Sequence, residues 1–420
     1  MEKAKQFGKI KYLIIFFTSL IILYLRRPDV LVNAQFWAED GWAWYAEMHN
    51  LGIASLFHPM NGYFQTISRL TMLITLPFGI INAPLVSNLV SLIIRSFLVV
   101  FFFSKRFSSI PIYYRLVVSL FYLLIPNAEE VHGNITNIHW FLSIYLFLII
   151  ISDEIKSSWW KIHDFIVLII SGLSGPFIIF LLPTLIIKKY ILYKGIKKFD
   201  FTHWDITFIL IVMIQLIAIL SIDSSDRSVA PLQANFLLFC RIIVEKIILG
   251  TFLPTHDTYA FILESNVFVY LMMIVTFICL LLIAIKASWK FYSGFLFVVL
   301  MLSAALMRPM ISLVDPQWPA LLQPGAGERY FIITNLFFFS SILYGFYKLD
   351  EKIHCQYSTF IRSVIGILIG VIIYGSFSIA PLPNTNYRES IKTLYNTVPI
   401  GSEVKIPINP NGWYMTIIKK

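Results

Sequence analysis

Long apolar runs separated by short polar segments dominate the chain. Crossing a bilayer takes roughly 17 to 25 residues of helix, or fewer where short helices pack among neighbours. The runs that meet this requirement are residues 11–25, 83–103, 112–126, 137–152, 161–174, 176–190, 204–222, 266–287, 290–308, 330–348 and 361–380. The pattern therefore predicts an all-α polytopic membrane protein of about eleven transmembrane helices, with residues 1–380 forming the bundle.

Two segments leave this helix count open. Residues 66–80 are apolar but short, and they contain Arg69 and Pro77. We interpret them as an interfacial helix within a long first outer loop, residues 26–82. The Ser171–Pro176 segment combines Gly and Pro between two apolar runs, which indicates a turn between two short helices. One kinked helix is the alternative, and it would change the parity of every later span.

Charge gives an expected orientation, because cytoplasmic loops collect Lys and Arg. The basic start of the chain is followed by no small-residue cleavage site, so the first run reads as an uncleaved helix with its N-terminus inside. The predicted inside loops carry Lys105, Arg106, Arg115, Lys156, Lys161, Lys188, Lys189, Lys194, Lys197, Lys198, Lys286, Lys290, Lys348, Lys352 and Arg362. The predicted outside segments carry Glu39, Asp40, Glu129, Glu130, Asp223, Asp226, His256, Asp257, Asp315 and Glu328.

Composition supports the membrane class. Of 420 residues, 58% are hydrophobic and 13% are charged, whereas soluble domains carry roughly 25% charged residues. The mean hydropathy is +0.77. The net charge of +10 lies in short clusters between apolar runs, which indicates membrane lipids and not nucleic acid as partners. Cys240, Cys279 and Cys355 show no metal-ligand spacing and are expected to be apolar fillers.

The adjacent acids Glu39 and Asp40 are the strongest candidates for chemistry. They follow the first apolar run and are surrounded by the aromatics of the Phe36–Tyr45 segment. An ionisable group at the rim of a bilayer is a functional candidate by default. Gly41 lets the backbone turn directly after the acids, and the adjacent sequence offers no Lys or Arg to pair with them. The same loop contributes Arg69 and His58 as candidates for substrate binding.

The second outer loop, residues 126–140, holds another dense polar cluster. Helix capping explains an Asn at such a position but not two acids and two imidazoles. We expect this loop to form a polar wall that faces the substrate, with a divalent cation as the alternative, although the spacing matches no metal signature. The candidate residues are Glu129, Glu130, His132, Asn134 and His139.

A third cluster precedes the tenth apolar run. Residues 324–331 form a Gly-rich turn that leads into Arg329 and Tyr330 at a helix start on the predicted outer side. An Arg there runs against the charge trend and needs an anion, and its guanidinium binds phosphate oxygens in a fork. We therefore expect a phosphate seat, with an Arg paired to Glu328 or to a lipid headgroup as the alternative.

The early Glu39-Asp40 pair, the long first loop and the Gly327–Phe331 turn resemble the GT-C superfamily of integral membrane glycosyltransferases. The resemblance implies a polyprenyl-phosphate sugar as donor and an essential acid in the first outer loop, at the position of Asp40. It also implies a second acidic motif, at Glu129 or Glu130. Branches of that fold with a large soluble C-terminal domain fit less well, because only about 40 residues follow the last span.

Such a donor defines the expected chemistry. Asp40, with Glu39 beside it, would take a proton from an acceptor hydroxyl as general base while Arg329 stabilises the departing lipid phosphate, and direct displacement predicts inversion. No cofactor is expected. High Ile, Phe and Lys content indicates a bacterial plasma membrane, an undecaprenyl carrier and a cell-wall or surface polysaccharide, with the active site on the extracytoplasmic face.

Two alternatives remain open at this stage. The first is a transporter or flippase, and the second is a polymerase or ligase of surface polysaccharide. The short extracytoplasmic tail, residues 381–420, is expected to pack on the bundle, either as a lid over the acceptor site or as an interfacial anchor. The sequence does not encode the identity of the sugar or of the acceptor.

Overall fold

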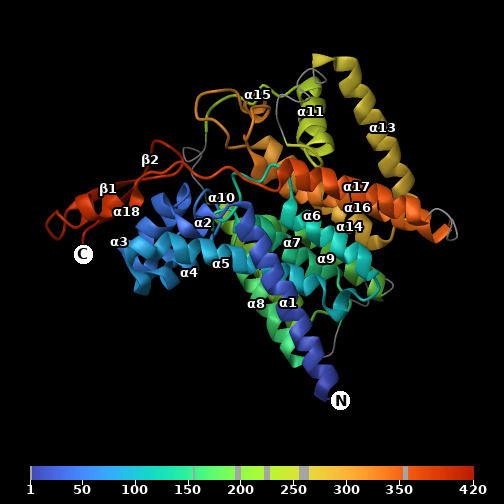
Figure 1. Cartoon of the computed structure of the whole chain (residues 1–420), viewed down its shortest axis with the longest axis horizontal. Helices are drawn as coiled ribbons and strands as arrows, with labels where there is room; N and C mark the ends of the chain where they lie inside the picture. The colour runs from blue at the N-terminus through green and yellow to red at the C-terminus, as the bar shows by residue number, and fades with distance from the viewer. Residues whose placement is uncertain (1, 155–156, 194–199, 222–227, 255–263, 353–357) are drawn as a thin grey trace.

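The computed structural model describes the chain apart from residues 1, 155–156, 194–199, 222–227, 255–263 and 353–357. It is mostly helical, with 70% helix and 5% strand. A helix lies in each of the eleven apolar runs (Figure 1). These helices are α1 (Glu2–Arg26), α5 (Gly79–Phe102), α6 (Ile112–Leu124), α7 (Ile138–Ile151), α8 (Ser158–Gly172), α9 (Phe177–Tyr193), α10 (His203–Leu220), α13 (Asn266–Ala284), α14 (Trp289–Met307), α16 (Ile332–Lys352) and α17 (Ser358–Ser376).

Six stretches of the described residues combine the length and the apolar composition that crossing a membrane requires. They are Thr66–Phe102, His203–Leu220, Asn266–Ala284, Trp289–Met307, Glu328–Asp350 and Thr359–Ser376. The chain is therefore a helical membrane protein, while the count of eleven spans and their orientation stay predictions. Several residues considered above lie outside the described residues, namely Lys156, Lys194, Lys197, Lys198, Asp223, Asp226, His256, Asp257 and Cys355.

The Ser171–Pro176 segment is a turn between two separate helices, α8 and α9. Gly175 has a φ of 123°, a conformation that residues with a Cβ rarely adopt. One kinked helix is therefore excluded. The chain that enters α4 (Thr66–Thr75) docks on this turn, because the Thr66 amide donates a hydrogen bond to the Leu173 carbonyl at 3.0 Å.

The first loop is a compact succession of short helices and not an extended connection. Its elements besides α4 are α2 (Asp29–Val32), the π-helix η1 (Asp40–Tyr45), α3 (Ala46–Leu51), and the 3₁₀ turns η2 (Gly52–Phe57) and η3 (Leu76–Phe78). A π-helical turn is rare and occurs frequently at functional sites, and η1 begins at Asp40. α4 packs against α5 and buries Arg69 together with the hydroxyls of Ser68 and Thr71.

The bundle core lies where α5, α6, α7 and α16 meet, and the rings of Phe121 and Phe339 stack there with centroids 4.0 Å apart. Elements beyond the predicted runs are η4 (Lys105–Phe107), α11 (Phe236–Ile242), the π-helix η7 (Ile243–Leu249), α15 (Gln317–Leu321) and η9 (Glu328–Phe331). Residues 236–249 are apolar enough to have been recognised as helix from the sequence. α13 stands apart at the upper right of Figure 1, beside α11.

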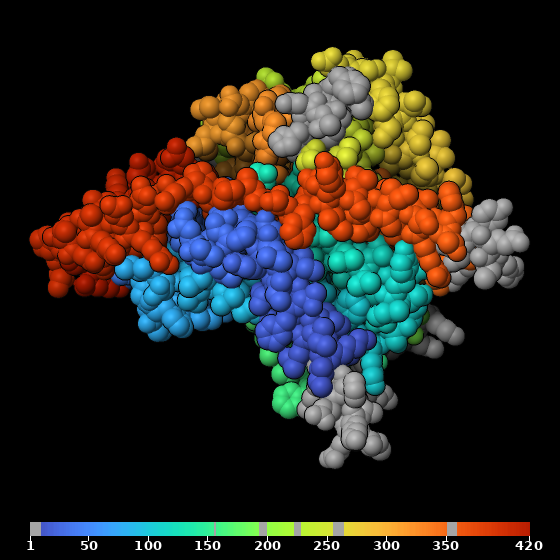
Figure 2. All heavy atoms as spheres, in the orientation of Figure 1, coloured from blue at the N-terminus to red at the C-terminus, as the bar shows by residue number. Residues whose placement is uncertain are grey.

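The tail after α17 contains a small sheet that the sequence analysis did not predict. Its elements are α18 (Tyr387–Ser390), the π-helix η10 (Ile391–Tyr395), β1 (Glu403–Ile408) and β2 (Trp413–Ile418). The strands pair antiparallel, and β2 contacts η1 and α3 of the first loop. Figure 2 shows the tail, in orange-red and red, lying along the blue residues that follow α1. Asn409 pairs with Trp37, so the tail reaches the residues directly before the acid pair.

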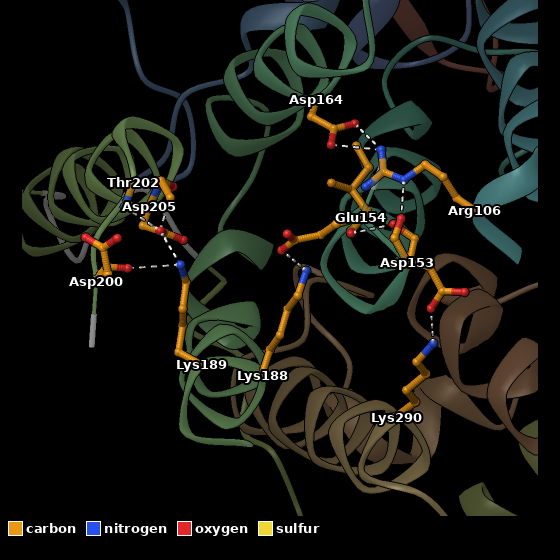
Figure 3. Close-up of polar contacts among 12 residues, drawn as sticks. Arg106, Asp153, Glu154, Asp164, Lys188, Lys189, Asp200, Thr202, Asp205 and Lys290 are labelled. Atoms are coloured by element: carbon orange, nitrogen blue, oxygen red, sulfur yellow. Dashed lines mark hydrogen bonds and ion pairs between the residues drawn. The ribbon is translucent and has the colours of Figure 1, made fainter. Parts of the chain in front are cut away.

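Ion pairs gather at the end of the bundle where α5 and α7 finish. Arg106 forms a salt bridge with Asp164 at 2.6 Å, and Lys290 lies 3.2 Å from Asp153 (Figure 3). Lys189 contacts Asp205 at 2.5 Å, where Thr202 and Asp205 form a capping box that begins α10. Because α7 begins next to Thr136 and ends next to Asp153, these pairs lie at the opposite end of the bundle from the acids that precede α7.

Candidate functional site

Asp40 is completely buried and holds two backbone groups of the segment between α6 and α7. Its Oδ1 accepts a hydrogen bond from the Thr136 amide at 2.8 Å, and its Oδ2 accepts one from the Ile135 amide at 3.1 Å. Burial raises the pKa of Asp40 well above its usual range. The two amide hydrogen bonds oppose this rise, and the charge of Glu39 adds to it. The carboxyl group thus joins the segment after α1 to the segment before α7.

Glu39 differs from its neighbour because its side chain is partly exposed. The Thr136 hydroxyl donates to Glu39 Oε2 at 3.4 Å and receives a hydrogen bond from the Trp44 indole at 3.1 Å. Ala38, directly before the acid, has a φ of 44°, a left-handed conformation that is uncommon for a residue with a Cβ. The local backbone is held in a strained arrangement that presents Glu39 and inserts Asp40.

The second and third polar clusters meet in one reciprocal contact. The guanidinium of Arg329 forms an ion pair with Glu130, and the Arg329 amide donates to Glu130 Oε2 at 3.2 Å. In return, the Glu130 amide donates to Glu328 Oε2 at 2.8 Å. Arg329 therefore pairs with Glu130 and not with Glu328, its expected alternative partner. Arg329 also interacts electrostatically with Glu39.

The Gly-rich turn shapes this contact. Gly327 has a φ of 63°, and a Cβ at this position would lie 2.7 Å from the Leu321 side chain. Tyr330 is buried, and its hydroxyl accepts hydrogen bonds from the Met310 amide at 3.0 Å and from Arg329 Nη2 at 3.2 Å. The tyrosine hydroxyl thus helps to fix the direction of the Arg329 guanidinium, and it does so as a hydrogen-bond acceptor.

A cavity of about 400 Å³ lies beside this contact, and we call it the acid–arginine cavity. Its ionisable lining residues are Arg27, Glu129, Glu130 and Arg329, and residues 380–383 at the start of the tail close one side. Trp37 also lines the cavity, whereas Glu39 and Asp40, two and three residues further on, do not. The two guanidinium groups and the two carboxylates balance in formal charge, and either guanidinium can bind the oxygens of an anion in a fork.

Arg27 is a functional candidate that the sequence analysis missed. Its Nη1 donates to the Glu129 carbonyl at 3.0 Å, and its Nε donates to the Ala380 carbonyl at 2.8 Å. The Glu129 side chain itself is exposed. The signal was present, because Arg27 follows the first apolar run on the predicted outer side, against the same charge trend that singled out Arg329.

Three of the predicted second-loop residues shape the loop and do not reach the acid–arginine cavity. Asn134 Nδ2 donates to the Glu130 carbonyl at 2.7 Å. His139 is buried with its ring stacked on Phe177 at 5.6 Å between centroids. His132 is buried with Nε2 2.9 Å from the Leu23 carbonyl. Burial, with nearby arginines, lowers the pKa of His132 well below its usual range, so this imidazole is neutral.

The two remaining first-loop candidates, Arg69 and His58, gather at a separate acid, Glu47. Arg69 is buried and lies 2.6 Å from Glu47 Oε2, and the half-exposed His58 lies 3.9 Å from the same oxygen. Trp44 links this group to the acid pair, because its ring lies 5.0 Å from the Arg69 guanidinium while its indole nitrogen binds Thr136. Within the described part of the chain, no group of three His, Cys, Asp or Glu side chains is placed to hold a metal ion.

Comparison of the chain with protein-family models, with curated proteins and with solved structures finds no match in any of the three.

Proposed function

We propose that the chain is a membrane glycosyltransferase that moves a sugar from a polyprenyl-phosphate donor to a glycan or lipid-linked acceptor on the extracytoplasmic face, with inversion. The observation that carries the proposal is the acid–arginine cavity, where Arg329, held by Glu130, and Arg27 line one space next to the Glu39-Asp40 pair. An oriented guanidinium stabilises the phosphate that departs from such a donor. Under this proposal the N-terminus lies inside and the bundle is embedded in a plasma membrane.

The acid pair supplies the base in this proposal. The sequence assigns that role to Asp40, and the assignment stays a prediction. Burial and a raised pKa favour the protonated form of Asp40, which cannot accept a further proton. Glu39 is partly exposed and interacts with Arg329. We therefore favour Glu39 as the group that takes the acceptor proton and Asp40 as the residue that positions it.

The contact between Glu130 and Arg329 has a further consequence for the mechanism. A phosphate that binds Arg329 competes with Glu130 for the same guanidinium. Binding must therefore displace the Glu130 carboxylate or share the guanidinium with it. Arg27 lines the same cavity and offers a second cation for that exchange. Because a forked Arg contact holds two oxygens at once, the phosphate and not the sugar is the part of the donor that this cavity recognises.

The test is made in living cells that produce the protein, because the cells supply the lipid-linked sugars and the sugar need not be known beforehand. Cells that produce the wild-type protein, the Glu39→Gln variant or the Asp40→Asn variant are extracted, and their polyprenyl-phosphate sugars are measured by mass spectrometry. An active transferase consumes its donor, so one lipid-linked sugar is depleted with the wild type and retained with Glu39→Gln. Glu389→Gln, an exposed acid of the tail, is the matched control and behaves as wild type. Identical lipid pools for wild type and Glu39→Gln at equal protein levels would overturn the proposal.

A further inference from the structure

Two side chains of the π-helical turn η1 are directed at one residue, Thr136. The Asp40 carboxylate accepts a hydrogen bond from the Thr136 amide at 2.8 Å, and the Trp44 indole nitrogen donates one to the Thr136 hydroxyl at 3.1 Å. Trp44 is 2% exposed, so its indole N–H has exchanged water for this single hydroxyl. The turn therefore fixes the Thr136 backbone through Asp40 and the Thr136 side chain through Trp44.

The hydrogen bonds at the Thr136 hydroxyl have a defined direction. An indole nitrogen is a donor only, and a threonine hydroxyl carries a single hydrogen. Because Trp44 donates to the Thr136 oxygen, the hydroxyl hydrogen is left for another acceptor, and Glu39 Oε2 lies 3.4 Å away. A hydrogen bond of this length depends on a hydrogen that points at the acceptor. Rotation of the hydroxyl would abolish it, and Trp44 opposes that rotation.

Trp44 is itself held on its other side. Its ring lies 5.0 Å from the guanidinium carbon of Arg69, within the range of a cation–π contact. Arg69 is 1% exposed and forms an ion pair with Glu47 at 2.6 Å. The ring is therefore clamped between a fixed cation and Thr136, which keeps the indole N–H directed at the hydroxyl.

This arrangement distinguishes the two oxygens of Glu39. Oε2 receives the Thr136 hydroxyl, whereas no residue in the described part of the chain donates a hydrogen bond to Oε1. The Glu39 side chain is partly exposed, so solvent or a ligand reaches it. Asp40 and Arg329 interact electrostatically with Glu39, and neither one forms a hydrogen bond with it in the structure. One oxygen is thus anchored and the other is available.

We propose that Trp44 and Thr136 are positioning residues that hold the Glu39 carboxylate by Oε2 and leave Oε1 to take the acceptor proton. The role of Oε1 rests on the proposed function. In that step the acceptor hydroxyl gives its proton to Oε1 and its oxygen forms the new bond to the anomeric carbon. The bond from that carbon to the phosphate oxygen breaks, and the lipid phosphate leaves with the electron pair.

The first experiment tests the anchoring of Glu39 and needs no sugar. The full-length protein in detergent is treated with a water-soluble carbodiimide and glycine ethyl ester over a range of pH, and mass spectrometry follows Glu39. The carbodiimide activates protonated carboxyl groups, so labelling falls as Glu39 loses its proton, and Asp40 is too buried to react. Thr136→Val is expected to move the midpoint of labelling up by about half a pH unit, because the charged carboxylate loses a hydrogen bond.

Two further variants calibrate this shift. Trp44→Phe keeps a ring beside Arg69 but removes the indole N–H, so a smaller shift in the same direction is expected. Thr136→Ser keeps the hydroxyl, and its midpoint is expected to match that of the wild type. A midpoint that stays in place in Thr136→Val refutes the anchoring of Glu39, whether or not the protein transfers a sugar.

The second experiment measures how fast producing cells deplete the lipid-linked sugar. Thr136→Val is expected to lower this rate about tenfold, and Thr136→Ser to retain most of it. A packing role predicts the reverse order, because Val keeps the shape of Thr and Ser loses a methyl group. Trp44→Phe is expected to cause no further loss when added to Thr136→Val, since it acts through the hydroxyl. Trp42→Phe, an exposed change on the same turn, is the matched control.

The outcomes separate this inference from the proposed function. Depletion by the wild type with Ser no better than Val at position 136 refutes the positioning role and leaves the transferase proposal standing. No depletion by the wild type refutes the transferase proposal, and with it the role of Oε1, while the labelling midpoint still decides whether Thr136 and Trp44 hold Glu39.

Discussion

The backbone amide of Thr136 donates a hydrogen bond to Oδ1 of Asp40 at 2.8 Å, so a residue of the segment before α7 fixes an acid of the segment after α1. The hydroxyl of the same threonine donates to Glu39 at 3.4 Å. One residue therefore sets the positions of both carboxylates, and the two acids differ in what they contribute. Asp40 is fully buried and binds backbone amides, while Glu39 is partly exposed to solvent.

The first prediction separates stability from catalysis at the acid pair. Asp40→Asn is expected to lower the free energy of unfolding by about 1–3 kcal/mol, because an amide side chain has one acceptor oxygen for two backbone amides held at separate positions. Glu39→Gln is expected to leave the unfolding temperature unchanged and to lower the rate of sugar transfer by about 10²–10⁴-fold. Thermal unfolding in detergent and donor consumption in membranes measure the two effects.

The pH dependence of this comparison provides its control. Burial raises the pKa of Asp40, so the wild-type protein binds that proton more tightly when folded and loses stability as the pH rises above the unfolded value of about 4. Asparagine has no such proton. The stability deficit of Asp40→Asn is therefore expected to shrink as the pH rises, and a deficit that grows instead contradicts the burial of an acid at this position.

The second prediction concerns the pair of Arg329 and Glu130. Arg329→Met is expected to destabilise the protein by about 2 kcal/mol, because it leaves the Glu130 carboxylate without its charged partner. Arg329→Lys restores the charge but not the fork, nor the contact of Nη2 with Tyr330. We therefore expect Lys to recover part of the stability and little of the transfer activity. Arg388→Gln, an exposed Arg of the tail, is the control for loss of a positive charge.

The third prediction follows from the buried imidazole of His132. Burial and the charges of Arg95, Arg26 and Arg27 lower its pKa, so the unfolded chain binds the proton more tightly than the folded protein does. The stabilisation is complete above the unfolded pKa of about 6.5 and is lost as the pH falls toward the folded value. We expect the unfolding temperature to fall as the pH is lowered below about 6.5. In the His132→Gln variant, the unfolding temperature is expected to depend less on pH in this range.

The fourth prediction uses two glycines of one turn. Gly325 and Gly327 have φ values of 72° and 63°, so alanine at either position is expected to cost about 1–2 kcal/mol in backbone strain. At Gly327 the added Cβ also meets the Leu321 side chain at 2.7 Å, whereas at Gly325 no described atom lies within 4 Å. Gly327→Ala is therefore expected to be the more destabilising, as measured by thermal unfolding. Equal losses of stability for the two variants would show that the Cβ at residue 327 does not clash with Leu321, and would contradict the prediction.

The helices were largely predictable, because long hydrophobic segments are easily recognised in a sequence. The turn at Ser171–Pro176 was also predictable, since Gly and Pro together interrupt a helix for local reasons. In the first loop, only the helix over residues 66–80 was predicted, and α4 and η3 lie there. The other short helices and the burial of Arg69 were not predicted. α4 packs against α5, and η1 and α3 pack against β2 of the tail, and no local pattern records such long-range contacts.

The composition of the site was partly predictable, and its arrangement was not. Charge placed against the membrane trend identified Arg329, and the same rule applied to Arg27 would have found it as well. Arg329 pairs with Glu130, and the Glu130 amide binds the Glu328 carboxylate. These contacts depend on how two loops almost 200 residues apart are aligned, which sequence spacing does not show. The same holds for the burial of Asp40, because an acid with two backbone partners looks in sequence like one exposed to water.

The pairing of Trp37 with Asn409 has a consequence for biogenesis. The Ala38 amide donates to the Asn409 carbonyl at 2.5 Å, and the Asn409 amide donates to the Phe36 carbonyl at 3.1 Å. A ribosome delivers the first of these partners to the membrane long before the second. The stretch around Glu39 therefore gains these hydrogen bonds only after the chain has been synthesised as far as Asn409. A translational arrest or a proteolytic cut ahead of this asparagine would leave a polypeptide that has all of its long helices but lacks these hydrogen bonds beside Glu39.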